Sequence, residues 1–210
     1  MKSYAHMSLS DVLDAFASNE PVPGGGSAAA LAGAVGTSLL VMVAGLPSTR
    51  TGAPEEAADL AEASSRLRPI CDELASLVQQ DSDAYAAVLE AMRLPKGTSD
   101  EKQARRATID FAMRLATEVP LQTMRCCQQA LAGAVVVAAN GNRNASTDTA
   151  AGVELLLAGL RSAGLNVDVN IDSVTDASFT SRVAEERREL AEDADADAQR
   201  ARAELGIKND

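Results

Sequence analysis

The sequence predicts an all-α fold, an antiparallel bundle of about seven helices. Apolar residues recur at spacings of three and four along most of the 210 residues, and clusters of Pro, Gly and Asn separate these segments by short connections. The one alternating, β-branched stretch, Asn166 to Asn170, is too short and solitary to form a sheet. The length predicts a single domain over residues 1–210, which buries its core without disulfides or metals.

The composition argues against several classes of protein. The formal net charge is −11 with no basic tail or row of aromatic side chains to offset it, so nucleic acid and anionic membranes are not expected partners. A single histidine, His6, and three cysteines without a Cys-x-x-Cys pair predict no metal site. The odd number of cysteines and an N-terminus without an apolar run predict a reducing, cytoplasmic location.

The first two predicted helices flank a glycine-rich turn. Ser8 and Asp11 have the spacing of a capping box, which predicts a short helix after Ser8. The turn over residues 21–26 then interrupts regular structure, and Ser27 is the expected N-cap of a helix that ends near Gly45.

This second helix has almost no charge. Ser27 to Pro47 contains about twenty uncharged residues, roughly the length of a membrane span. It lacks flanking Trp, Tyr and a basic stop signal, and its many small residues allow another helix to approach closely. We therefore expect a central, buried helix that also contributes to a homodimer interface, because so long an uncharged surface is rarely left in water.

Two long apolar patterns occupy the middle of the chain. The first covers residues 55–92 and contains Pro69, which either kinks one helix or begins a second. After a loop, Ser99 is the expected cap of a helix to about Glu118, and Pro120 is expected to open the next one.

The remaining helices follow a polar connection. Residues 140–144 (Asn-Gly-Asn-Arg-Asn) have poor helix and strand propensity, and Ser146 or Thr147 is the expected N-cap of a helix to Leu160, closed by Gly164. Residues 176–205 form a heavily charged helix, which more often presents a solvated face than a binding arm.

Asp81 is the most informative polar residue. Steps of three and four from Leu77 and Val78 reach Asp81 and then Tyr85, so a carboxylate occupies the stripe expected to be buried. Burial would raise its pKa and suit it to general acid or base catalysis. A structural Asp, satisfied by a helix N-terminus or a Tyr hydroxyl, explains the pattern equally well. Asp83 lies roughly 200° around the helix and is the weaker candidate.

Two turns have the geometry of binding sites. The backbone amides of Gly24, Gly25, Gly26 and Ser27 precede an apolar helix, an arrangement that attracts carboxylate or phosphate, although three glycines also permit a tight, closely packed turn. The Asn-Gly-Asn-Arg-Asn loop is similarly ambiguous, because amides and an Arg bind polar heterocycles and also simply form turns.

Several of these segments, taken in order, resemble one known family. The motifs are PVPGGGSAAA (residues 21–30), DSDAY (81–85), LPK (94–96), PL (120–121), GNRNASTD (141–148) and Asn166 to Asn170 followed by Asp176. In order and spacing they resemble the cyclodeaminase/cyclohydrolase family of folate enzymes, which includes the C-terminal domain of formiminotransferase-cyclodeaminase and stand-alone bacterial methenyltetrahydrofolate cyclohydrolases. The resemblance implies an all-helical homodimer that acts on the one-carbon unit of tetrahydrofolate, without a metal or a cofactor beyond that substrate.

The resemblance also suggests roles for individual residues. Asp81 and Asp148 are the expected acid and base, because hydrolysis of the methenyl group needs one group to activate water and another to protonate the departing nitrogen. The expected substrate-binding residues are Gly24, Gly25, Gly26, Ser27, Asp83, Tyr85, Lys96, Asn142, Arg143 and Asn144. The anionic glutamate of folate requires a local basic patch, for which Lys96, Arg105, Arg106 and Arg143 are the candidates.

One departure from the family pattern leaves three functions open. Residues 47–51 (Pro-Ser-Thr-Arg-Thr) stand where relatives carry a Lys-Lys-Tyr-like stretch, and Arg50 is the one obvious cation left there. The leading interpretation is a methenyltetrahydrofolate cyclohydrolase that interconverts 5,10-methenyltetrahydrofolate and 10-formyltetrahydrofolate. The alternatives are a formiminotetrahydrofolate cyclodeaminase that releases ammonia, and a non-catalytic helical dimer that binds folate or a protein partner.

Overall fold

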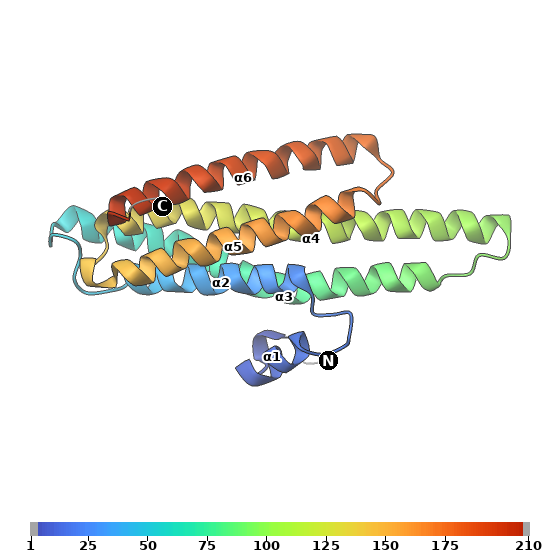
Figure 1. Ribbon diagram of the computed structural model, residues 1–210, viewed down its shortest axis with the longest axis horizontal. Helices are drawn as coiled ribbons and strands as arrows, with labels where there is room; N and C mark the ends of the chain where they lie inside the picture. The colour runs from blue at the N-terminus through green and yellow to red at the C-terminus, as the bar shows by residue number, and fades with distance from the viewer. Residues whose placement is uncertain (1–3, 208–210) are drawn as a thin grey trace.

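The computed structural model describes residues 4–207, and over that range it is helical without any strand (Figure 1). This confirms the predicted all-α class, whereas the predicted count of about seven helices is not confirmed, since the described residues form six α-helices. Two short 3-10 segments, η1 (Tyr4–His6) and η2 (Arg143–Ala145), complete the chain. The helices are α1 (Leu9–Phe16), α2 (Gly25–Ala44), α3 (Pro54–Arg93), α4 (Ser99–Asn140), α5 (Ser146–Ile171) and α6 (Ala177–Leu205).

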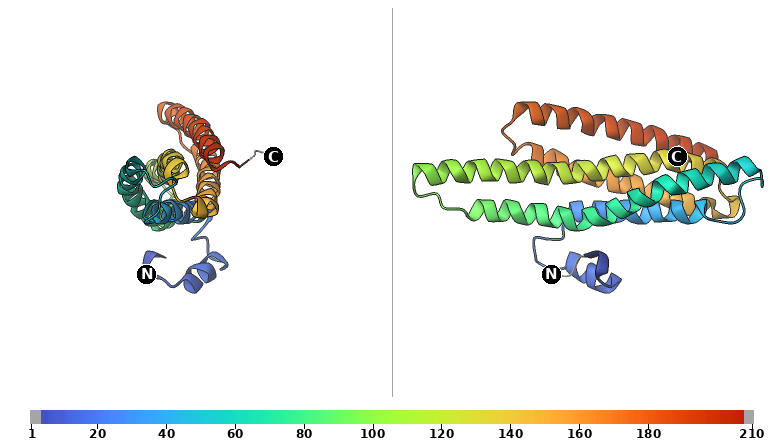
Figure 2. Two further views of the ribbon diagram at one scale, coloured as in Figure 1. Left: turned by 90° about the vertical axis from the view of Figure 1, so that its left-hand side faces the viewer. Right: turned by 180° about the vertical axis from the view of Figure 1, so that it is seen from behind.

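Helices α2 to α5 form an up-down-up-down bundle, in which α2 lies between α3 and α5 and runs antiparallel to both (Figures 1 and 2). Helix α6 packs outside this ring against α4 and α5, and the N-terminal segment lies on the side of α2 and α3. Helices α3 and α4 have 40 and 42 residues against 20 in α2, so their connected ends project beyond the rest of the bundle (Figure 1).

Both long helices continue through a proline, which is why residues 4–207 contain fewer α-helices than predicted. Pro69 lies on the exposed side of α3, where water can solvate the Ser65 carbonyl that has lost its helical N–H partner. Pro120 is buried inside α4. Because proline has no N–H, the Ala116 carbonyl has no backbone hydrogen-bond donor within the helix. Asn170 Nδ2 donates to that carbonyl at 2.7 Å, so a side chain from α5 replaces the missing backbone donor.

The helix starts differ from the predicted caps at three places. Ser8 caps α1 as predicted, and its side chain accepts from the Asp11 amide. The N-cap of α2 is Gly24, which places Ser27 inside the first turn. The N-cap of α4 is Thr98, in a complete capping box, and the N-cap of α5 is Ala145 rather than either hydroxyl residue after it.

Helix α5 continues past Gly164 to Ile171, so the predicted end of this helix near Leu160 is wrong. The β-branched stretch 166–170 forms its last turns. Val167 is buried and Asn170 is bonded to α4, so tertiary packing overrides the weak helix propensity of this segment.

Helix α2 packs closely because of its small residues. It is the one helix in the described part of the chain that is long and apolar enough to cross a membrane, with a mean hydropathy of 1.9, but 56% of that window is buried within the protein. A Cβ on Gly36 would lie 2.8 Å from the Gly152 carbonyl oxygen of α5, so glycine on both helices sets their separation.

This close approach predicts the effect of Gly159→Ala. A Cβ there would lie 2.8 Å from the Ala29 carbonyl oxygen and 3.1 Å from the Gly33 amide, both of them backbone atoms. We expect a loss of about 1 to 3 kcal/mol in the free energy of unfolding, measured by urea denaturation. Gly45→Ala is the control, because its nearest atom outside its chain neighbours is 3.4 Å away. Equal stability of the two variants would contradict the close packing of α2 on α5.

Candidate active site

The first turn of α2 meets the middle of α3 at Asp81. Ser27 Oγ donates to Asp81 Oδ2 at 2.9 Å and lies 3.1 Å from Ser82 Oγ. Ser27 and Ser82 are buried, while Asp81 is half-buried. The Ser27 amide also donates to the Asp81 carboxylate. A carboxylate from α3 therefore satisfies the N-terminus of α2.

The glycine turn is what allows this contact. A Cβ on Gly26 would lie 2.6 Å from Asp81 Cγ, too close for any side chain, so the carboxylate rests against the bare Cα. A Cβ on Gly25 would lie 3.6 Å from Asn166 Nδ2, an ordinary contact. Gly24 offers no side chain to cap the helix, and Asp81 takes over that function from α3.

Burial raises the pKa of Asp81, and this effect outweighs the hydrogen bonds from the Ser27 hydroxyl and amide, which lower it. The environment suits a carboxylate that exchanges a proton during a reaction. A purely structural Asp81 would need a helix N-terminus to satisfy it, and the first turn of α2 supplies one. The geometry is therefore compatible with both roles, and the catalytic role stays a prediction.

The remaining residues of the same motif lie on two different sides of α3. Tyr85 follows Asp81 on its stripe, and because α2 begins at Gly25, it lies on the projecting part of α3 and is 44% exposed. Asp83 is exposed on another side, where it accepts a hydrogen bond from Gln79 at 2.9 Å. The two carboxylates do not form a pair, as the helical spacing predicted.

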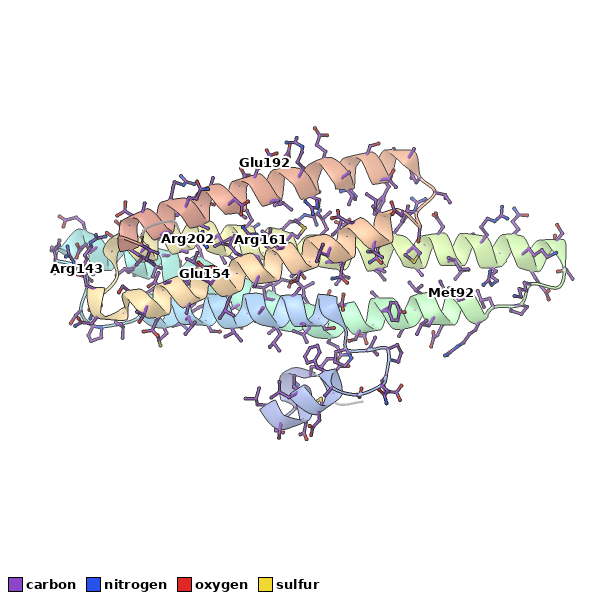
Figure 3. The ribbon with its side chains drawn as sticks, in the orientation of Figure 1. Met92, Arg143, Glu154, Arg161, Glu192 and Arg202 are labelled. Carbon is purple, nitrogen blue, oxygen red and sulfur yellow. The ribbon has the colours of Figure 1, made fainter. Side chains whose placement is uncertain are left out.

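The residues predicted to form a basic patch are not all free to bind the glutamate of folate. Lys96 lies exposed in the loop between α3 and α4, at the projecting end marked by Met92 in Figure 3. Arg105 donates from Nε and Nη2 to the Met92 carbonyl and so ties α4 to the end of α3. Arg106, the next residue of α4, is exposed.

The asparagine loop lies at the opposite end of the bundle, where Figure 3 labels Arg143. Asn142 Oδ1 accepts from the Asn144 amide at 2.9 Å and caps η2. Arg143 and Asn144 are exposed, and Asp148 is half-buried in the first turn of α5.

The two predicted catalytic carboxylates do not meet within one chain. Asn166 of α5 lies beside Gly25, so it is at the same height along the bundle as the Asp81 site. From there to Asp148 is about five helical turns, or about 27 Å along the same edge of the helix. A single chain therefore places Asp81 and Asp148 too far apart to act on the same carbon.

Arg50 has a structural role. Its guanidinium donates to the carbonyls of Ala138 and Ala139 at the end of α4 and pairs with Glu204 of α6, with Nη1 3.4 Å from the carboxylate. It borders a cavity of about 160 Å³ together with Asn142 and Arg143. Arg50, the cation that stands in place of the Lys-Lys-Tyr-like stretch, is therefore already bound by groups of the protein itself.

Two residues of the site have no predicted role in the sequence motifs that contain them. Ser82 is buried by its contact with Ser27, and Asn166 faces the glycine turn. Asn166 and Asn170 are four apart, the signature of a common helical face, but the β-branched residues between them obscured that signal. In residues 4–207 no group of three or more His, Cys, Asp or Glu is placed to hold a metal ion.

Fold and site together define an all-helical bundle protein with a desolvated carboxylate at the start of its central helix. A family model described as formiminotransferase-cyclodeaminase matches residues 8–189. The chain therefore belongs to the formiminotransferase-cyclodeaminase family, which confirms the resemblance found in its motifs.

Individual relatives differ in length and in their named activity. A methenyltetrahydrofolate cyclohydrolase of Methylorubrum extorquens is 41% identical over 175 residues, which cover 83% of this chain and 82% of the relative. The formimidoyltransferase-cyclodeaminase of Gallus gallus is 29% identical over 82% of this chain, which corresponds to 32% of that longer protein. The solved structure of a formiminotetrahydrofolate cyclodeaminase from Thermotoga maritima has the same fold, with a TM-score of 0.85, 23% identity and 96% coverage of both chains.

Proposed function

We propose that this protein is a methenyltetrahydrofolate cyclohydrolase and that Asp81 is its principal acid–base residue. The observation that carries the proposal is the Asp81 carboxylate, which has a raised pKa and is held by Ser27 against the glycine turn at the start of α2. A purely solvated surface acid would have none of these features.

The proposed reaction requires three proton transfers. Asp81 accepts a proton from a water molecule as the water oxygen bonds to the electron-poor carbon between N5 and N10 of the substrate. The N5–carbon bond then breaks as Asp81 returns its proton to N5, and the hydroxyl of the adduct loses its remaining proton to solvent, so that the carbon stays on N10 as a formyl group and one proton is released overall. The free amides at the start of α2 are suited to hold a carbonyl or carboxylate oxygen of the substrate, because a helix N-terminus favours negative charge.

The choice of hydrolysis over deamination rests on the relatives. The cyclohydrolase of similar length is 41% identical to this chain, whereas the animal cyclodeaminases match at about 29% over a third of their length. The cyclodeaminase is the second candidate, supported by the shared fold of the Thermotoga maritima enzyme. In that reaction the N10 nitrogen attacks the formimino carbon and ammonia leaves, which calls on the same acid and base.

We also propose a homodimer in the cytoplasm with the folate glutamate near Lys96 or Arg143. The support for a dimer is an uncharged, exposed face on α2 and α5, where Val35, Met42, Leu165 and Val169 are 45–71% exposed. The support for the glutamate contact is that the side chains of Lys96 and Arg143 are both exposed.

The proposal is tested by absorbance. The pure protein is mixed separately with 5,10-methenyltetrahydrofolate and with 5-formiminotetrahydrofolate, and the methenyl absorbance is followed. We expect catalysed decay of the first compound. Growth of the methenyl absorbance from the second would instead establish the cyclodeaminase, and no change in either mixture would support a non-catalytic folate-binding or protein-binding dimer.

A further inference from the structure

Two buried hydroxyl groups lie next to the half-buried Asp81 carboxylate. Ser27 is 0% exposed and Ser82 is 3% exposed, so neither hydroxyl reaches a bound substrate. The proposed reaction uses the carboxylate and the amides of the first turn of α2, and it gives these two hydroxyls no part. Contact with substrate therefore does not explain why they are there.

Ser82 carries a buried hydroxyl at a position where an apolar side chain would fit. It follows the buried Val78 by one helical turn on α3, and alanine would fill nearly the same volume there. A buried hydroxyl without a hydrogen-bond partner is destabilising. Within residues 4–207 the partner of Ser82 is Ser27, and their Oγ atoms lie 3.1 Å apart. The Ser82 hydroxyl is therefore satisfied through α2 and not through its own helix.

The positions of the two hydroxyl protons follow from the number of donors. Each serine has a single O–H proton and can accept through its oxygen. Ser27 donates its proton to Asp81 Oδ2 at 2.9 Å, so Ser82 must be the donor to Ser27 Oγ. Both protons therefore point along one chain, from Ser82 through Ser27 to the carboxylate.

A chain with this direction stabilises the charged form of Asp81. Burial raises the pKa of Asp81, and the hydroxyl and amide of Ser27 lower it without cancelling the effect of burial. Ser82 strengthens the contribution of the hydroxyl, because a donor that itself accepts a hydrogen bond is more strongly polarised. A general base must be charged at the working pH in order to take a proton from water. The chain therefore limits the rise in pKa that burial causes.

The chain also distinguishes the two oxygens of the carboxylate. A proton on Oδ2 would make Asp81 the donor to Ser27, so that Ser27 had to donate to Ser82. The Ser82 hydroxyl would then have to turn away to a carbonyl of its own helix. Oδ1 accepts from neither serine, so a proton on Oδ1 leaves both hydroxyls as they are.

We infer that Ser82 and Ser27 reserve Oδ2 of Asp81 as a hydrogen-bond acceptor, so that Oδ1 is the oxygen that takes the proton from water and returns it to N5. Ser82 acts on the carboxylate through Ser27 and is a positioning residue. The inference rests on the proposed function, because it assigns two proton transfers of that reaction to one atom.

The test is the pH profile of kcat/KM for Ser27→Ala, Ser82→Ala and the double variant. Ser27→Ala removes a hydrogen bond to a charged group, so the acid limb should move to higher pH by about one unit or more. Ser82→Ala should move the limb in the same direction but by less. The double variant should match Ser27→Ala, because Ser82 acts only through Ser27. Ser76→Ala, exposed and six residues earlier on α3, is the matched control and should leave the profile unchanged.

The sign of the Ser82→Ala shift decides which oxygen carries the proton. If the proton resided on Oδ2, Ser82 would accept from Ser27 in the neutral form, and its loss would move the limb to lower pH. That result would overturn the inference. A limb at the position of the Ser76→Ala control, or a double variant whose shift is the sum of the two single shifts, would overturn it as well. A lower melting temperature with an unchanged limb would leave Ser82 with a structural role alone.

A titration that does not depend on activity separates this inference from the proposed function. Proteins labelled with carbon-13 at the aspartate carboxyl carbon are titrated by NMR, and the Asp81 signal is the one missing from Asp81→Asn. The pKa of Asp81 should rise from wild type to Ser82→Ala to Ser27→Ala. An active enzyme without this order would overturn the serine chain and leave the cyclohydrolase proposal standing. A wild-type protein that shows this order without turnover would overturn the proposed function, and with it the transfer of the proton to N5.

Discussion

Asp81→Asn is expected to lower the turnover of 5,10-methenyltetrahydrofolate by about a hundredfold or more. The amide keeps the shape of the side chain and an oxygen to accept the Ser27 hydrogen bond, but it can neither take nor return a proton. The measurement is kcat and KM from the decay of methenyl absorbance, together with the melting temperature. Asp72→Asn, nine residues earlier on the same helix and exposed, is the matched control and should keep its turnover.

The pH dependence provides a second test of Asp81. Since burial raises its pKa, the wild-type kcat/KM should fall with decreasing pH through a pKa above that of an ordinary Asp, and Asp81→Asn should lose this limb of the profile. A carboxyl with a raised folded-state pKa favours folding most below its unfolded pKa, and this contribution is lost as the pH rises through the folded pKa. Near neutral pH the variant therefore removes a poorly solvated charge, so its melting temperature should change little.

A structural role for Asp81 predicts a different result. The carboxylate would then act mainly as the cap of α2, and its loss would lower the free energy of unfolding by about 1 kcal/mol. Turnover of the folded variant would remain normal. Normal turnover combined with reduced stability would therefore refute the catalytic assignment.

Gly26→Ala is expected to reduce turnover nearly as much as Asp81→Asn, although it adds only a methyl group. The new Cβ would lie 2.6 Å from Asp81 Cγ, so the carboxylate must leave its position against the first turn of α2. Alanine is favoured over glycine within a helix by about 0.5 to 1 kcal/mol, which offsets part of the steric cost. Turnover should therefore fall far more than the melting temperature does.

The adjacent Gly25→Ala is the control for this substitution. It has the same gain in helix propensity, but its Cβ would be 3.6 Å from the nearest atom, Asn166 Nδ2. We expect it to keep its fold and most of its turnover. A Gly26→Ala protein as active as Gly25→Ala would show that the position of Asp81 is not critical.

The sequence by itself determined the helical class, the small-residue helix and the position of Asp81. These features are local: a spacing of three and four specifies a helix and its buried face, and that spacing places a carboxylate on the stripe of α3. The turn before α2 was equally visible, because three successive glycines mark a tight turn wherever they occur.

Only the tertiary structure decided where helices end and which polar residues meet. Pro120 stays inside α4 because Asn170, on another helix, serves the Ala116 carbonyl, and propensity contains no information about so distant a donor. Arg50 binds the end of α4 and Glu204 of α6, and these partners too are so distant in the sequence that local propensity does not reveal them. The separation of Asp81 from Asp148 follows from the register of antiparallel helices, which side-chain packing fixes and local periodicity does not.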